Sequence, residues 1–355
     1  MGIALRLARQ GQGNVAPNPK VGAVIIKNNR LIGWGYHPHA GDPHAEIFAL
    51  RKAGALAKDA TLYITLEPCC HFGKTPPCTT AIINSGIRRV VVATYDPNPQ
   101  VRRKGLKELL KAGIEVHYGL FKKEAQLLNK EFFTFYVKKR PYIRIKFAMT
   151  LDGKIATSNR ESCWLSSDTS RSFTNRLRAL SDALLVGITT ILQDNPRLTI
   201  RTGRRKAAVF HRIILDTFLK TPPDALLFDS VDPVLLFTSA DQNTILKTAY
   251  PAHCEIIQVS SSGTTLNLSE IITILYHKNI ESLLVEGGAQ TISSFLEAKI
   301  ADEIFAVIAP ALLGGTTSLN FAQFINEKPL NAMLSLQEPK IIKIHNDIIL
   351  NYQLG

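Results

Sequence analysis

Residues 67–78 read EPCCHFGKTPPC, and a shorter segment, DPHAE, precedes them at residues 42–46. The shorter segment is typical of a helix start, because Asp is a good N-cap and Pro is favoured at the first helical position. Together the two segments offer an imidazole at His44 and a cluster of three cysteines. One histidine and two thiolates fill three of the four tetrahedral positions of zinc and leave the last position for water, as in catalytic zinc sites. The two segments therefore predict a zinc site in the first half of the chain.

A carboxylate that is not a zinc ligand can carry protons beside such a site, and Glu46 is placed for this role. The pattern H-x-E followed by P-C-x-x-C is the signature of zinc-dependent nucleobase deaminases. Here eight residues, instead of two, separate Cys69 from Cys78. Residues two apart on a regular helix point to opposite sides, so His44 and Glu46 can converge only in an irregular first turn.

Three other interpretations are compatible with these residues. The cysteines and His71 could form a structural zinc knot, although such sites usually close with four protein ligands in paired spacing. The chain could be a deaminase of transfer RNA, but no basic segment with interleaved aromatic residues indicates RNA binding. It could also be a zinc-stabilised binding protein without catalysis, and replacement of Glu46 would distinguish that case from an enzyme.

The composition is that of a globular protein with two domains. The 355 residues exceed the usual size of one domain, and 45% are apolar. No apolar run is long enough to span a membrane, and the N-terminus lacks the features of a signal peptide. Five cysteines do not indicate a disulfide framework, so we expect a cytoplasmic protein. The basic residues behind the net charge of +13 are scattered along the chain, which is compatible with nucleic acid and with phosphorylated small molecules and does not decide between them.

Hydrophobic periodicity predicts alternating strands and helices in both halves. The boundary is expected at Arg140-Pro141, where proline discourages continuation of a helix, giving domains 1–140 and 141–355. Both halves are predicted to be three-layer α/β domains. The predicted strands are 21–27, 31–36, 61–65, 89–94, 114–118, 142–149, 183–186, 212–215, 234–237 and 282–285. The predicted helices are 1–10, 43–56, 78–85, 101–111, the stretch from 121, 169–180, 269–277 and 289–296.

A Gly-Gly turn between a strand and a helix is the best local indication of function in the second half. The segment LLVEGGAQT covers residues 283–291. Glycines there let a phosphate approach the backbone, and the helix N-terminus supplies amide donors. No G-x-G-x-x-G follows the first strand, so the dinucleotide-binding fingerprint is absent. By itself the pattern predicts an α/β domain with an anionic ligand.

The first half resembles the deaminase domain of the bifunctional deaminase–reductases of riboflavin biosynthesis. The resemblance is carried by PNPKVG at 17–22, HAE at 44–46, TLEPC at 65–69 and TPPC at 75–78, and the long cysteine spacing is that of the family. It implies a fold similar to cytidine deaminase and one Zn²⁺ per chain. It also implies His44, Cys69 and Cys78 as ligands, Glu46 as proton carrier and Asn18 as a base contact, with no role for Cys70.

The second half resembles the reductase domain of the same family, whose fold is similar to dihydrofolate reductase. The resemblance is carried by KFAMTLDGKIA at 146–156, RESCW at 160–164, DNPRLTIR at 194–201, LDT at 215–217 and PALLGG at 310–315. It implies NADPH contacts at Ala148, Trp164, Thr190, Asp194, Thr217, Gly288, Ala289, Gln290, Thr291, Ile292, Ser293 and Ser294. It implies contacts of a phosphoribosyl substrate at Ser162, Arg178, Leu198, Arg201 and Glu286. Cys163, Asn195 and Thr217 depart from the residues usual in the family.

The resemblance therefore implies two reactions in one chain. The first domain would deaminate diaminohydroxyphosphoribosylaminopyrimidine, and the second would reduce the ribosyl side chain to ribityl with NADPH, giving 5-amino-6-(5-phosphoribitylamino)uracil. The expected partner is a phosphorylated pyrimidine, with no nucleic acid and no membrane. We also expect a homo-oligomer.

Overall fold

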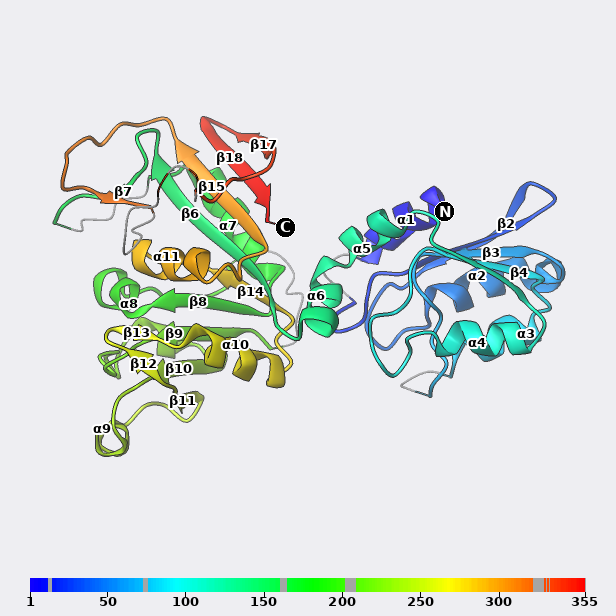
Figure 1. Cartoon of the computed structure of the whole chain (residues 1–355), viewed down its shortest axis with the longest axis horizontal. Coiled ribbons are helices and arrows are strands. Elements are labelled where there is room, and N and C mark those ends of the chain that lie inside the picture. The colour runs from blue at the N-terminus through cyan, green and yellow to red at the C-terminus, as the bar shows by residue number, and fades with distance from the viewer. Residues whose placement is uncertain are drawn as a thin grey trace. The chain divides into compact units, whose positions relative to one another are not determined.

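The chain consists of two compact units, Met1–Lys139 and Arg140–Gly355 (Figure 1). A computed structural model describes residues 1–11, 15–72, 76–159, 165–201, 209–321, 329, 331 and 333–354. Among these residues no helix is long and apolar enough to cross a membrane.

The first unit contains a five-stranded sheet in the order β2-β1-β3-β4-β5. Strand β1 is antiparallel to both β2 and β3, whereas β3, β4 and β5 are parallel. The strands are β1 (Gly22–Lys27), β2 (Arg30–Tyr36), β3 (Thr61–Ile64), β4 (Arg89–Val92) and β5 (Glu115–Tyr118). The helices are α1 (Gly2–Ala8), α2 (Ala45–Ala53), α3 (Cys78–Asn84), α4 (Lys104–Lys111), α5 (Lys122–Leu128) and α6 (Lys130–Lys138).

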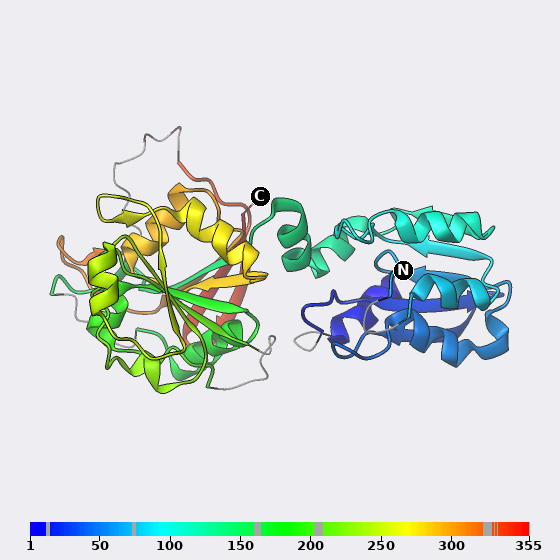
Figure 2. The same cartoon turned by 90° about the horizontal axis from the view of Figure 1, so that it is seen from below.

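Helices cover both faces of this sheet. The larger core joins α2, α3 and α4 to the sheet through residues such as Ala49, Ile82 and Leu109. A smaller cluster on other elements contains Leu5, Ala93 and Ala125. The layering is visible from two directions in Figures 1 and 2. The unit is thus a three-layer α/β domain, as predicted.

Two glycines of β2 determine how closely α2 can approach the sheet. A Cβ atom on Gly33 would lie 2.3 Å from the carbonyl oxygen of Ala49, and one on Gly35 would lie 2.5 Å from that of Ala45. Only glycine allows such close packing of a helix backbone on a strand. These glycines therefore help to set the position of the N-terminal end of α2, where His44 lies.

The second unit contains a nine-stranded sheet in the order β11-β10-β9-β8-β14-β6-β15-β18-β17. The strands from β11 to β15 are parallel, and β18 and β17 are antiparallel to their neighbours. They are β6 (Tyr142–Thr150), β8 (Ala183–Gly187), β9 (His211–Leu215), β10 (Val234–Thr238), β11 (Cys254–Gln258), β14 (Ser282–Val285), β15 (Glu303–Ala309), β17 (Lys340–Ile344) and β18 (Asp347–Gln353). Two short pairs lie outside the sheet, β7 (Lys154–Ala156) with β16 (Leu319–Asn320) and β12 (Ser261–Ser262) with β13 (Thr265–Leu266).

Each face of this sheet has its own core, because alternate residues of a strand point to opposite faces. In β14, Leu283 and Val285 belong to one core and Leu284 to the other. Helices α10 (Leu268–His277) and α11 (Ala289–Glu297) contribute to the first core. Helices α7 (Asp168–Ala179) and α8 (Ile188–Asp194) contribute to the second. The second unit is therefore also a three-layer α/β domain.

Most predicted elements are confirmed within a few residues, and two differences matter. Helix α2 begins at Ala45 with His44 as its N-cap, so the start predicted at Asp42-Pro43 is wrong by two residues. The other difference concerns β15, β17 and β18, which were not predicted. Helix α9 (Gln242–Lys247) and strands β11, β12 and β13 lie in or beside a stretch whose sequence pattern is weak.

Candidate active sites

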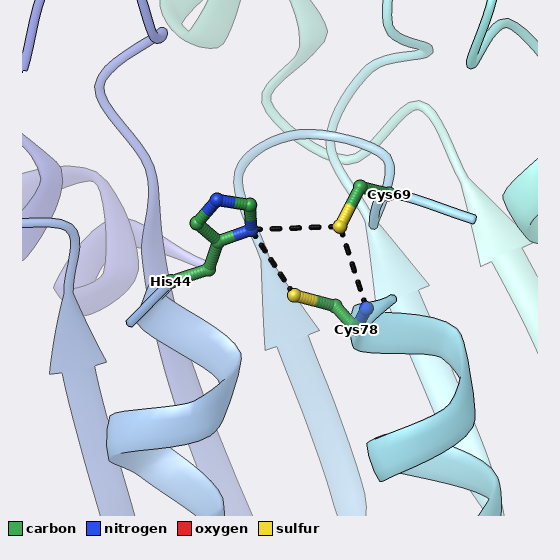
Figure 3. Close-up of side chains that lie close together, drawn as sticks. All are labelled: His44, Cys69 and Cys78. Atoms are coloured by element: carbon green, nitrogen blue, oxygen red, sulfur yellow. Dashed lines mark hydrogen bonds between the residues drawn. The ribbon is translucent and has the colours of Figure 1, made fainter. Parts of the chain in front are cut away.

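Three side chains from separate elements meet in the first unit (Figure 3). His44 is the N-cap of α2, Cys78 is the first residue of α3, and Cys69 lies in the loop that follows β3. The Nδ1 atom of His44 is 3.2 Å from Sγ of Cys78 and 3.5 Å from Sγ of Cys69. The ligand atoms of all three lie within 4.8 Å of one another.

The spacing of these atoms fits a tetrahedral zinc ion. Zinc bonds of about 2.0–2.1 Å to nitrogen and about 2.3 Å to sulfur place a nitrogen and a sulfur ligand about 3.6 Å apart at the tetrahedral angle. The two observed nitrogen–sulfur distances, 3.2 and 3.5 Å, are close to that separation. Three protein ligands also leave one position for water, which distinguishes catalytic sites from closed structural ones.

The pKa values of the two thiols are shifted in opposite directions. Hydrogen bonds from Cys78 and His44 lower the pKa of Cys69 to about 4, although burial acts in the opposite direction. The backbone N–H of Cys78 also donates to Sγ of Cys69, at 3.3 Å. The pKa of Cys78 is raised by its hydrogen bond with Cys69 and by burial. The cluster thus already favours a thiolate at Cys69, the form that binds metals.

Glu46 lies in the first turn of α2 and is buried, with 2% of its surface exposed. Burial raises the pKa of its carboxyl group to about 7. Its Oε2 atom is buried and has no hydrogen-bond partner among the described residues. Because His44 is extended rather than helical, with φ −73° and ψ 166°, the two-residue offset does not force the side chains of His44 and Glu46 apart.

Asn18 is linked to this site through His37. The amide nitrogen Nδ2 of Asn18 lies 3.0 Å from Nε2 of His37, and Nδ1 of His37 lies 3.2 Å from the carbonyl oxygen of Pro43. The ring of His37 packs edge-to-face on that of His44, with centroids 5.2 Å apart. Burial lowers the pKa of His37, so the ring is neutral near physiological pH.

Cys70 and His71 stay outside the cluster. Among the described residues, the group that could hold a metal ion consists of His44, Cys69 and Cys78. Burial and nearby carboxylates raise the pKa of Cys70, which disfavours the thiolate. A structural knot that includes His71 therefore has no support within the described part of the chain.

Glu67 is a buried carboxylate that the sequence did not indicate. Its oxygens accept hydrogen bonds from the backbone N–H groups of Asp96 (3.2 Å), Arg103 (2.9 Å) and Leu106 (3.4 Å). Glu67, which precedes Cys69 by two residues in the chain, is thereby joined to the N-terminal end of α4. The partners are distant in sequence, so spacing alone gave no signal for this role.

A cavity of about 810 Å³ opens in the second unit, at the carboxyl ends of several parallel strands. It brings together most residues that the resemblance implied for the reductase site: Ala148, Arg178, Thr190, Asp194, Leu198, Arg201, Thr217, Glu286, Gly288, Ala289, Gln290, Thr291 and Ser294. Two others do not line it, because Ile292 is fully buried in the core and Ser293 is 3% exposed. Ser162, Cys163 and Trp164 lie outside the described residues.

An ion pair lies at the wall of this cavity. Nε and NH2 of Arg178 donate to the two carboxylate oxygens of Glu286, at 2.9 and 2.7 Å, and NH1 donates to the carbonyl oxygen of Thr199, at 3.1 Å. Arg178 thus lines the cavity, as the resemblance implied, with its guanidinium held by Glu286 and by the backbone. Lys146, which was not predicted, lines the same cavity, and burial lowers its pKa.

The Gly-Gly turn lies where β14 leads into α11. Gly288 is the N-cap of α11, with φ −68° and ψ 175°, and a Cβ atom there would meet no atom within 4 Å. The first hydrogen bond of the helix runs from the N–H of Ile292 to the carbonyl oxygen of Gly288. The preceding amides have no partner within the helix, and Ala289, Gln290 and Thr291 line the cavity.

Two of the residues that differ from the usual family residue make hydrogen bonds in the structure. Asn195 adopts the left-handed conformation, φ 37°, at the end of α8, and its Oδ1 accepts the N–H of Leu226 at 2.9 Å. The hydroxyl of Thr217 donates to the carbonyl oxygen of Thr264 at 2.7 Å. Toward a ligand that hydroxyl can therefore act only as an acceptor.

The two halves match different family models. Residues 1–94 match the cytidine and deoxycytidylate deaminase zinc-binding region, and residues 141–350 match the RibD C-terminal domain.

Similar proteins align over nearly the whole chain. Riboflavin biosynthesis protein RibD of Aquifex aeolicus is 41% identical over 99% of this chain and 97% of its own length. Two solved structures each cover 100% of this chain and 97% of their own. One is RibD of Acinetobacter baumannii, with 35% identity and a TM-score of 0.86. The other, from Thermotoga maritima, is a diaminohydroxyphosphoribosylaminopyrimidine deaminase/5-amino-6-(5-phosphoribosylamino)uracil reductase, with 36% identity and a TM-score of 0.84. With its zinc-site geometry and its reductase-like second unit, the chain belongs to the RibD family of bifunctional deaminase–reductases of riboflavin biosynthesis.

Proposed function

We propose that the first unit removes an exocyclic amine from diaminohydroxyphosphoribosylaminopyrimidine by zinc-dependent hydrolysis. We propose that the second unit then reduces the ribosyl side chain with NADPH to give 5-amino-6-(5-phosphoribitylamino)uracil. The observation that carries the first step is the cluster of His44, Cys69 and Cys78 beside the buried Glu46. The proposal for the second step rests on the cavity and on family membership.

In the deaminase site His44, Cys69 and Cys78 would hold one zinc ion, which when bound activates water as a nucleophile near neutral pH. Glu46 takes the proton of the attacking water at Oε2, the atom that has no partner among the described residues. A carboxyl group with a pKa of about 7 can accept this proton and then donate it to the ring and to the leaving ammonia. Asn18 contacts the pyrimidine base.

In the reductase site a bound nicotinamide cofactor would supply the hydride, and C1 of the ribosyl group would receive it. The ring oxygen of the sugar must gain a proton as its bond to that carbon opens. Lys146 is suited to deliver it, because burial lowers its pKa and it lies near the Glu286 carboxylate. Arg178 holds Glu286 in place through two hydrogen bonds. Arg201, which is exposed at the cavity, is the better partner for the substrate phosphate.

The remaining cavity residues bind NADPH in this proposal. The amides at the start of α11 face the cavity and suit the cofactor's phosphate groups. Ala148, Thr190, Asp194, Thr217 and Ser294 would line the rest of the cofactor site. Binding of NADPH rather than NADH, a cytoplasmic location and a homo-oligomeric state all belong to the proposal. Titration with both cofactors and light scattering of the purified protein test the first and the last.

Incubation of purified protein with the diaminopyrimidine substrate, with and without NADPH, tests both steps. Mass spectrometry should detect the deaminated ribosylamino compound without NADPH and the ribityl product with it. Recovery of unchanged substrate from zinc-loaded protein would refute the first step. Deaminated compound that NADPH does not convert would refute the second.

A further inference from the structure

The ring of His37 is buried and has a polar neighbour at each of its two nitrogens. It follows directly after β2, its backbone N–H donates to the carbonyl oxygen of Val21 at 3.1 Å, and only 2% of its surface is exposed. Its edge-to-face contact with His44 ties it to the zinc-ligand cluster. A buried ring with this many contacts has one orientation, so its two nitrogens have defined partners.

The partner of Nδ1 determines where the ring carries its hydrogen. The carbonyl oxygen of Pro43, 3.2 Å away, can only accept a hydrogen bond. Nδ1 therefore donates to this oxygen, and Nε2, whose neighbour is the NH2 group of the Asn18 amide, accepts.

The lone pair at Nε2 in turn determines the orientation of the Asn18 amide. An amide presents either its NH2 group or its oxygen to a neighbour, and an acceptor such as Nε2 is matched only by the NH2 group. The atom of Asn18 that lies 3.0 Å from Nε2 is Nδ2, the donor end of the amide. Within the described part of the chain no donor reaches Oδ1 of Asn18, which remains available to a ligand.

We propose that His37 is a positioning residue for deamination, which orients Asn18 so that Oδ1, and not the NH2 group, faces the pyrimidine. This inference rests on the proposed deamination and on Asn18 as its base contact. A fixed acceptor selects a base edge that carries N–H groups, such as that of an aminopyrimidine. A reversed amide would select a carbonyl edge instead. His37 thereby contributes to substrate specificity without contacting the reacting atoms.

Two substitutions at His37 test the contacts of the two ring nitrogens separately. In His37→Gln the longer side chain can place an acceptor near the position of Nε2, whereas His37→Asn can replace only the contact made by Nδ1. We expect His37→Gln to retain most of the kcat/KM for ammonia release. We expect His37→Asn to lose on the order of 10- to 100-fold, as when a buried hydrogen-bonding group is mispaired. His39→Asn is the matched control, since His39 lies on the same loop, is half-exposed and donates or accepts a side-chain hydrogen bond with Asp42.

The decisive measurement repeats both substitutions in an Asn18→Ala background, with zinc content determined for every variant. If His37 acts through Asn18, the difference between Gln and Asn at position 37 should disappear there. Equal activity of the two variants, or a difference that persists without Asn18, would overturn the proposal. Loss of zinc from both would assign His37 to packing against His44 and would overturn it equally. Failure of the wild-type protein to release ammonia would instead refute the proposed function.

Discussion

Gly288 offers a test of where the cofactor binds that is separate from folding. In Gly288→Val the new side chain would enter the cavity, because a Cβ atom at this position meets no atom within 4 Å. The backbone is already in a conformation open to any residue, with φ −68°. The substitution should therefore leave the fold intact and hold the cofactor phosphate away from the amides of α11.

The magnitudes of the two effects differ clearly. A hydrogen bond to a charged group contributes about 1.5–3 kcal/mol, so losing one should weaken NADPH binding about 10- to 100-fold. Loss of glycine at an N-cap costs about 1 kcal/mol and is largely offset by the lower entropy of the unfolded chain. The melting temperature of the second unit should therefore change by less than about 2–4 °C, the shift that a full 1 kcal/mol would cause.

Gly287→Ala is the matched control, for which the expected effect is on the stability of the second unit. Its Cβ would lie 2.6 Å from Cβ of Thr291, so it should destabilise the second unit by about 1–3 kcal/mol. The assay is an NADPH titration and a thermal melt on the same sample, with ammonia release as a check on the first unit. A folded Gly288→Val variant with an unchanged NADPH dissociation constant would refute the placement of the cofactor.

Three further predictions concern the zinc ligands, the proton carrier and the buried ion pair. Purified protein should contain about one zinc per chain, measured by metal analysis. Cys69→Ser or Cys78→Ser should remove the zinc, and the matched control Cys70→Ser should keep it. Zinc loss in Cys70→Ser alone would contradict the ligand assignment. Glu46→Gln should keep its zinc and lower the rate of ammonia release by about 10²–10⁴-fold, while NADPH oxidation with deaminated intermediate continues; deamination at the wild-type rate would exclude Glu46 as the proton carrier. Arg178→Met removes two hydrogen bonds from the buried Glu286 carboxylate and should destabilise the second unit by about 3 kcal/mol, measured as denaturant unfolding without substrate. Glu286→Gln in that background should restore part of the stability, and an unchanged unfolding midpoint in Arg178→Met would show that the ion pair is not structural.

The chemistry of the first unit could be predicted from the sequence because it depends on residue types at fixed spacings. A histidine, a non-ligand glutamate two residues later and the long Cys69–Cys78 spacing are all visible in one dimension. The strands of both sheets could be predicted for the same reason, since apolar runs bounded by turns mark buried parallel strands. The later strands β15, β17 and β18 were not predicted. Strands β17 and β18 are antiparallel to their neighbours and mix exposed with buried residues, so they lack the continuous apolar run that marks a buried parallel strand.

The roles of individual polar groups were decided only by the tertiary structure. The sequence offers Arg178 as a substrate contact, and only the fold shows that its guanidinium also binds Glu286, the residue that follows β14. The sequence offers Glu67 as part of a motif, and the fold brings the amides at the start of α4 to its carboxylate. It likewise gives Asn18 as an amide with two ends, and only His37 and the carbonyl oxygen of Pro43 decide which end is free. Residue types and their spacing determine which chemistry a chain can support. Hydrogen bonds between distant segments determine which atoms remain to perform it, because each buried polar group needs a partner that only the folded chain brings near.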